Sequence, residues 1–158
     1  MKRALDRIDR AILAELRNDA RITNKELAAK VHLSPSSCHT RVQRLHTEGV
    51  ILGFHADFDP ARLGVGIQAL ITIRLRQHNR ASMDATYLEI AEYPEVLTVY
   101  RLAGANDLLL HVAVRDVDHL REMTLERLPE NPSVSSFETA LIYESRRAAG
   151  MPDLLPEK

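Results

Sequence analysis

The spacing of apolar positions divides the chain into two parts. Up to residue 48, apolar residues recur every three or four positions, which is typical of amphipathic helices. From residue 67 to residue 143, short runs alternate between apolar and polar residues, which is typical of half-buried strands. The pattern therefore predicts an α+β protein whose helical first part is followed by a mixed second part.

Capping residues mark the starts of the helices in the first part. Thr23 and Glu26 fit the S/T-x-x-E capping box, in which each side chain binds the other residue's backbone amide. Ser34 is a good N-cap, and Pro35 follows it at the first helical position, where no amide hydrogen is needed. A short helix, a tight connection and a longer helix form a helix-turn-helix. The predicted helices span residues 6–18, 23–30 and 34–48.

The third predicted helix has two different sides. Cys38, Val42 and Leu45 fall on one stripe, which we expect in the core. The outer side carries hydroxyl, glutamine and arginine side chains, which suit DNA backbone and base edges, and residues 27–47 include no acid. The alternative is a solvated helix of any small helical domain. The predicted DNA-binding residues are Lys30, Ser34, Ser36, Ser37, Thr40, Arg41, Gln43 and Arg44.

The composition changes after this helix. Residues 50–58 are rich in β-formers and predict a strand or a small wing, which Asp59 and Pro60 end. Residues 61–66 contain two glycines and predict a hinge. The predicted organisation is a winged helix-turn-helix domain at 1–60, a hinge at 61–66, a second domain at 67–147 and a C-terminal tail at 148–158.

The second domain follows a β-α-β-β-α-β order. Strands are predicted at 67–75, 96–102, 107–114 and 134–143, with one helix capped by Ser82 and another by Asp116 or Asp118. This order is the ferredoxin-like plan, an antiparallel sheet with both helices on one face. The other face stays bare and predicts at least a homodimer. Its expected apolar members are Leu97, Val99, Leu109 and Phe137.

Composition limits the class of protein. The chain has 158 residues, of which 45% are hydrophobic and 27% charged, as in soluble globular proteins. It has no apolar run near the ~20 residues of a membrane span and no signal-peptide pattern, and its single cysteine fits a reducing cytoplasm. Residues 1–60 hold 10 Lys and Arg against 8 Asp and Glu. This mild excess permits DNA binding, and we expect more than one copy to be needed for affinity.

Other chemistry finds little support in the sequence. Four of the seven histidines lie between residues 32 and 55, but no carboxylate or cysteine completes a metal-binding set with them. Cys38 lies on the core stripe, so packing explains it better than nucleophilic catalysis. We predict no metal, no cofactor and no enzymatic activity.

The chain resembles the Lrp/AsnC family, the feast/famine transcription regulators. The resemblance covers nearly all of the chain, and its most specific part is the LSPSSCHTRV start of the third helix. The matching stretches are LDRIDRAIL at 5–13, RITNKELA at 21–28, LSPSSCHTRVQRL at 33–45, GVILGFHA at 49–56 and LAGANDLLLHV at 102–112.

This resemblance implies a winged helix-turn-helix joined to a ferredoxin-like βαββαβ (RAM) domain that binds a small effector, usually an amino acid. It also implies dimers that dock through the sheet face, often assemble to octamers and bind double-stranded DNA on a roughly palindromic site. Glycine permits close approach of a ligand, and a carboxylate can accept from its ammonium group. The implied effector residues are Gly104, Ala105, Asn106 and Asp107, with Ser136 and Thr139 as weaker candidates.

Two alternatives stay open. Siroheme decarboxylases resemble Lrp/AsnC proteins but bind a tetrapyrrole, for which His111 and Arg101 are candidates here. The outward residues of the third helix argue against that enzyme because they suit DNA. A DNA-architectural protein without an effector is the other alternative, and DNA binding without sequence preference would favour it. An alternative for the Gly104–Asp107 stretch is a plain β-turn in which Asp107 supports its own loop.

Overall fold

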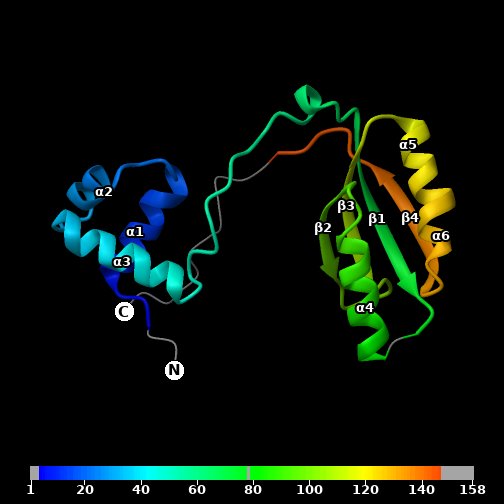
Figure 1. The fold of residues 1–158 in the computed structure, drawn as a ribbon, viewed down its shortest axis with the longest axis horizontal. Helices are drawn as coiled ribbons and strands as arrows, with labels where there is room; N and C mark the ends of the chain where they lie inside the picture. Colours follow the sequence, from blue (N-terminus) through cyan, green and yellow to red (C-terminus); the bar gives the residue numbers. More distant parts are fainter. Residues whose placement is uncertain (1–3, 78, 147–158) are drawn as a thin grey trace. The chain divides into compact units, whose positions relative to one another are not determined.

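The computed structural model describes residues 4–77 and 79–146. Its contacts divide the chain into two compact units, and the division falls between Ala56 and Asp57. Figure 1 shows helices α1–α3 in the first unit and the sheet with its helices in the second. The predicted tail at 148–158 lies outside the described residues.

The first unit is a three-helix domain. Its helices are α1 (Arg7–Asn18), α2 (Asn24–Lys30) and α3 (Pro35–Thr47), so the three predicted helices are confirmed. The apolar stripes of all three meet in one core, where Cys38 and Leu45 have no exposed surface. The other fully or nearly buried members of this core are Ile12, Leu27, Ala28, Val31 and Ile51.

The caps form as the sequence predicts, and one more appears. The Thr23–Glu26 capping box is present, and Ser34 Oγ accepts from the Ser37 amide at 3.2 Å. Asp6 and Asp9 form a second capping box at the start of α1. Each cap satisfies amides that have no partner within the helix, so the three helix starts are fixed locally.

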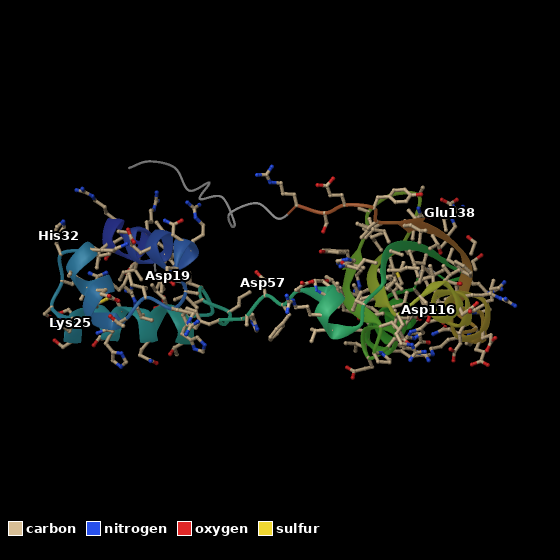
Figure 2. All side chains as sticks on the ribbon, turned by 90° about the horizontal axis from the view of Figure 1, so that it is seen from above. Asp19, Lys25, His32, Asp57, Asp116 and Glu138 are labelled. Carbon is tan, nitrogen blue, oxygen red and sulfur yellow. The ribbon has the colours of Figure 1, made fainter. Side chains whose placement is uncertain are left out.

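The turn between α2 and α3 is tight. His32 occupies it with a φ of 56°, the left-handed region that L-residues rarely adopt. Figure 2 shows His32 at the end of this unit. The Leu33 amide donates to the Ala28 carbonyl at 2.9 Å, and Asn24 Nδ2 donates to the Pro35 carbonyl at 2.8 Å. These bonds link the start of α2 to the start of α3.

The predicted strand or wing at 50–58 is wrong for this chain. Residues 52–59 have no regular secondary structure, and Figure 2 shows Asp57 on this extended stretch. Leu52 and Phe58 are 89% and 70% exposed, whereas Ile51 is buried in the helical core. The β-formers lack a neighbouring strand among the described residues, and a lone strand has no ladder of hydrogen bonds.

The predicted hinge residues belong to the second unit. A 3₁₀ turn, η1 (Pro60–Leu63), starts at the Asp59 cap, and Gly64 ends it with a φ of 82°. The Gly66 amide donates to the Val114 carbonyl at 3.0 Å. A Cβ at Gly66 would lie 2.2 Å from the Arg115 carbonyl oxygen, so only glycine fits there. The division between units therefore comes before residues 61–66.

The second unit contains one antiparallel sheet. Its strands are β1 (Ile67–Leu75), β2 (Val96–Arg101), β3 (Leu108–Val114) and β4 (Val134–Leu141), in the order β2-β3-β1-β4. This order and the antiparallel pairing confirm the ferredoxin-like plan. The last strand ends two residues earlier than predicted.

Helices cover one face of this sheet. They are α4 (Arg80–Ala91) and a second helix composed of α5 (Val117–Glu122), the π-helical turn η2 (Met123–Arg127) and α6 (Leu128–Glu130). Ile90, Met123 and Leu128 share one core with the alternate buried residues of β1. Asn79 caps α4 by accepting from the Ser82 amide at 2.9 Å, so the helix starts earlier than the predicted Ser82 cap.

The opposite face of the sheet has no covering element among the described residues. The strand register places Leu70 opposite His111 and Thr72 opposite Leu109, so these side chains share the open face. Val99 and Phe137 instead pack against the helix-covered core, which corrects their predicted place. The register places Val99 opposite the buried Leu110 and Phe137 opposite the buried Ile73, so both belong to the helix-covered face.

Candidate functional site

The outer face of α3 is hydrophilic and almost uncharged. Ser36, Thr40 and Gln43 are exposed and lie one helical turn apart or nearly so. Thr40 Oγ1 donates to the Ser36 carbonyl at 3.0 Å, which orients that hydroxyl along the helix. These side chains can donate and accept hydrogen bonds at base edges.

Three hydroxyls gather at the N-terminus of α3. Ser34 Oγ lies 2.8 Å from Ser37 Oγ and 3.1 Å from Ser36 Oγ. The first amides of a helix and its dipole favour a negatively charged group there. This end of the 13-residue helix suits a DNA phosphate.

Two predicted DNA-binding residues face another partner. Arg41 Nη1 donates to Asp6 Oδ2 at 2.6 Å and to Asp9 Oδ1 at 2.8 Å. Arg44 Nη2 lies 2.6 Å from Asp9 Oδ1, as an ion pair rather than an aligned hydrogen bond. Both guanidinium groups therefore lie against α1 in this structure. That Arg44 faces the major groove and Arg41 a phosphate stays a prediction. Arg41 and Arg44 lie beside the buried stripe of α3, where the carboxylate of Asp9 in α1 is within contact distance.

Asp6 and Asp9, the carboxylates that hold these arginines, were not predicted from the sequence to contact α3. Asp9 has no exposed surface although it is charged. A signal was present: Asp6 and Asp9 are spaced by three residues, as are Arg41 and Arg44, and this spacing places each pair on one helix face. Arg41 lowers the pKa of Asp6 through its hydrogen bond, helped by the Asp9 amide, and both carboxylates raise the pKa of Arg41.

Lys30 also has a partner. Its Nζ lies 2.6 Å from Glu15 Oε2, and its side chain is 55% exposed. The hydrogen bond from Lys30 to Glu15 raises the pKa of the lysine. An exposed pair of this kind holds the side chain only weakly, so Lys30 stays available to a phosphate.

The predicted effector turn is held by Asp107. Asp107 Oδ2 accepts from the Leu75 amide at 2.8 Å, and its own amide donates to the Ile73 carbonyl at 2.9 Å. Asp107 therefore ties the turn to the end of β1, as the plain-turn alternative expects. Gly104 is exposed, and a Cβ there would meet no atom within 4 Å. Ala105 is exposed and Asn106 half-buried beside it.

Ser136 and Thr139 do not converge. The register pairs Ser136 with Arg74 and Thr139 with Ile71, so the two side chains belong to opposite faces of the sheet. Within one chain the two side chains therefore do not share a surface, and their part in effector binding stays a prediction.

The two residues considered as contacts to a tetrapyrrole, His111 and Arg101, also lie apart. His111 is on the open face, where its Nε2 lies 2.9 Å from Gln68 Oε1. Arg101 pairs with the buried Leu108 on the other face, and its Nη1 lies 2.6 Å from Asp84 Oδ1 of α4. One chain therefore cannot place both side chains on one tetrapyrrole.

A cleft of about 240 Å³ lies at the start of β1, between Asp59 and Tyr143, and contains none of the predicted effector residues. Within residues 4–77 and 79–146, no three His, Cys, Asp or Glu side chains are placed to hold a metal ion. In the same residues no helix is long and apolar enough to cross a membrane.

Two family profiles match this chain. The AsnC-type helix-turn-helix domain matches residues 5–46, and the Lrp/AsnC ligand binding domain matches residues 68–150. The HTH-type transcriptional regulator AldR of Mycolicibacterium smegmatis is 46% identical over 147 residues, which cover 93% of this chain and 86% of AldR. The transcriptional regulator AzlB of Bacillus subtilis is 33% identical over 143 residues, covering 90% and 91% of the two chains.

Solved structures agree with these relatives. The crystal structure of MtbAldR has a TM-score of 0.76 and 38% identity and covers 94% of this chain and 100% of its own. The L-Met complex of the regulator NMB0573 from Neisseria meningitidis has a TM-score of 0.84 and 28% identity, with 92% and 94% of the chains covered. These proteins are named as regulators of transcription, which supports the prediction of a regulator rather than an enzyme.

Proposed function

Because this chain belongs to the Lrp/AsnC family of DNA-binding transcriptional regulators, we propose that the exposed face of α3 reads a specific DNA sequence and that an amino acid controls this binding. The protein then works in the cytoplasm, where such DNA and amino acids are accessible. The observation that carries the proposal is the outward row of Ser36, Thr40 and Gln43 on a helix whose other side is buried.

Hydrogen-bonding residues on this row supply sequence discrimination. Gln43 can bind adenine through two hydrogen bonds in the major groove, and the Thr40 hydroxyl and methyl groups suit several base edges. Ser34 and Ser37, at the helix N-terminus, contact a phosphate, and Lys30 adds a second phosphate contact. Arg41 and Arg44 are left out of this set because Asp9 holds them.

Two copies give the affinity that one nearly neutral helix lacks. The open sheet face, with Leu70 and Leu109, provides a surface on which a second copy docks, and the dimer is the unit from which octamers assemble. Two α3 helices about 34–36 Å apart then reach successive major grooves of a roughly palindromic site.

The amino acid binds at the turn that contains Gly104. The profile of the Lrp/AsnC ligand binding domain covers this turn, and the similar structure of NMB0573 is a complex with L-Met. The exposed backbone of Gly104 and Ala105 leaves room for the ligand's own backbone, and Asn106 lies beside it. Asp107 shapes the turn through the Leu75 amide, and a carboxylate can accept a hydrogen bond from the ligand's ammonium group.

The first experiment is a DNA-binding titration. Purified protein is titrated against labelled DNA from upstream of its own gene and against a scrambled sequence, at two salt concentrations, with and without the twenty amino acids. We expect selective binding that shifts with one amino acid. Selective binding that ignores every amino acid would remove the effector proposal, and equal binding to both DNAs would favour an architectural protein.

Gln43→Ala tests the base-reading face. We expect this change to weaken specific binding by about 1–3 kcal/mol and to leave binding to scrambled DNA unchanged, because only base contacts are lost. Arg121→Ala, at an exposed position of α5, is the control and should change neither affinity. Equal losses on both DNAs would show that Gln43 contacts phosphate.

Gly104→Ala tests the effector turn. The turn has room for the added methyl group, so the variant should fold and bind DNA normally without ligand. If a ligand's backbone approaches Gly104 closely, the methyl group blocks it, and at least a tenfold loss of response is expected, equal to ~1.4 kcal/mol. An unchanged response would place the effector elsewhere, with the cleft near Tyr143 as the next surface to test.

A further inference from the structure

We propose that Asp9 is a positioning residue that sets DNA specificity by holding Arg41 and Arg44 away from the phosphates. This inference rests on the proposed function, because it concerns which groups of α3 meet DNA. It differs from a capping role, since Asp9 acts through two side chains of another helix.

The carboxylates of the first capping box each perform two tasks. Asp6 Oδ1 accepts from the Asp9 amide at 2.9 Å, and Asp9 Oδ2 accepts from the Asp6 amide at 3.1 Å. The other oxygen of each carboxylate faces α3: Asp6 Oδ2 binds Arg41, and Asp9 Oδ1 contacts Arg41 and Arg44. The two carboxylates that cap α1 therefore also bind two guanidinium groups of α3.

Burial of the Asp9 carboxylate strengthens its hold on Arg41 and Arg44. The Asp9 side chain is 1% exposed, and the side chains of Arg41 and Arg44 are 27% and 22% exposed. A buried carboxylate is stable only when paired, so Asp9 retains its arginines against competition from solvent and ions. Arg44 Nε is buried without a hydrogen-bond partner, which confirms that this side chain is directed into the domain.

As a consequence, the guanidinium groups of Arg41 and Arg44 in α3 are not free to move to a DNA phosphate. The outward row of α3 then binds mainly through hydrogen bonds, which depend on base sequence, while non-specific binding depends on neutralised phosphates. A released arginine has a long stem and can reach a neighbouring phosphate from the flank of α3. Asp9 therefore keeps the ratio of specific to non-specific affinity high.

The experiment measures the salt dependence of binding to scrambled DNA. In Asp9→Asn we expect tighter non-specific binding, a slope of log affinity against log salt steeper by about 0.9 for each phosphate gained, up to two, and a lower specificity ratio. Adding Arg41→Gln and Arg44→Gln to Asp9→Asn should restore the original slope. Asp9→Glu, which keeps the charge, should stay closer to the original protein than Asp9→Asn.

Arg44→Gln alone separates the two possible roles of that side chain. If Asp9 holds Arg44 off the DNA, this variant leaves the salt slope unchanged. A flatter slope would show that Arg44 already neutralises a phosphate and would overturn the proposal. An unchanged slope and ratio in a folded Asp9→Asn protein would overturn it equally.

Thermal melting shows whether Asp9→Asn is folded. If it is not, Asp6→Asn provides a second test. Asparagine is as good an N-cap as aspartate, so this variant removes one carboxylate from Arg41 and keeps both the helix start and Asp9. We expect a smaller steepening, up to about 0.9. A steepening as large as in Asp9→Asn would show that Asp6 rather than Asp9 holds the arginines, and would overturn the proposal. Because scrambled DNA is used, these readouts stay decisive even if the original protein shows no specific site.

Discussion

In the first unit, the backbone conformation of one residue and the burial of another have effects on stability and reactivity that can be measured. His32 is the first of these residues, because its φ of 56° lies where a Cβ is strained. The left-handed conformation costs an L-residue about 1–2 kcal/mol, and glycine avoids this cost but loses about 0.5–1 kcal/mol in conformational entropy. The balance therefore favours glycine slightly.

We expect His32→Gly to stabilise the first unit by up to about 1 kcal/mol and His32→Val to destabilise it by about 1–2 kcal/mol. Urea unfolding followed by circular dichroism measures both. His39→Gly is the matched control: the same change at an exposed position inside α3 should cost about 1 kcal/mol. A loss in His32→Gly as large as in His39→Gly would contradict the strain argument.

Cys38, unlike the exposed His32, is fully buried. Burial raises the pKa of its thiol, and the side chain has no exposed surface. Since the thiolate is the reactive form, a disulfide reagent should modify Cys38 only through unfolded molecules, at a rate that rises with urea. Rapid, complete modification of the native protein would show that this part of the core opens without unfolding.

At the scale of elements, one buried carboxylate joins β2 to the second helix. Glu95 is 5% exposed; Arg127 Nη1 donates to its two oxygens at 2.9 and 2.7 Å, and His119 Nε2 lies 3.0 Å from Oε1. Burial alone would raise the pKa of Glu95, but the hydrogen bonds from His119 and Arg127 and the charge of Arg127 outweigh it. The pKa of Glu95 therefore lies below the ordinary 4.5.

A carboxyl group with a lowered pKa adds stability above its unfolded-state pKa and loses it as the pH falls through its folded-state pKa. The free energy of unfolding of the second unit should therefore decrease as the pH falls below the ordinary value of 4.5. Glu95→Gln should lose about 1–3 kcal/mol at pH 7 and show a weaker decrease in acid. Urea unfolding at pH 7 and pH 3.5 measures this, with the exposed Glu92→Gln as control; equal acid dependence in both variants would contradict the argument.

Elements were predictable from sequence where their cause is local. The caps at Thr23 and Ser34 and the alternation of residues 67–75 act within a few residues, and all three predictions are confirmed. The wing failed because a strand needs a partner, and residues 52–59 have none within the part of the chain that the structure describes. The ion pair of Arg44 with Asp9 could not be predicted, because it is a contact between α1 and α3 that helical periodicity alone does not contain.

At the scale of the whole molecule, we propose that a second copy docks on the open sheet face. Leu109→Asp places a charge on this face, opposite Thr72 and Tyr100. If a second copy docks there, burying an unpaired carboxylate should weaken dimerisation by at least tenfold, about 1.4 kcal/mol. Sedimentation velocity over a concentration series measures the change. Leu125→Asp, at a residue of the helix layer that is 62% exposed, is the control and should leave the dimer intact.

The separation of tasks along α3 has a consequence for how such proteins diversify. Cys38 and Leu45 hold the helix in the core, and the arginines pair with Asp9, while Ser36, Thr40 and Gln43 face outward. Substitutions at the three outward positions therefore leave stability almost untouched. After gene duplication, a copy of this protein can acquire a new set of target promoters by drift at those positions, without first passing through a misfolded ancestor.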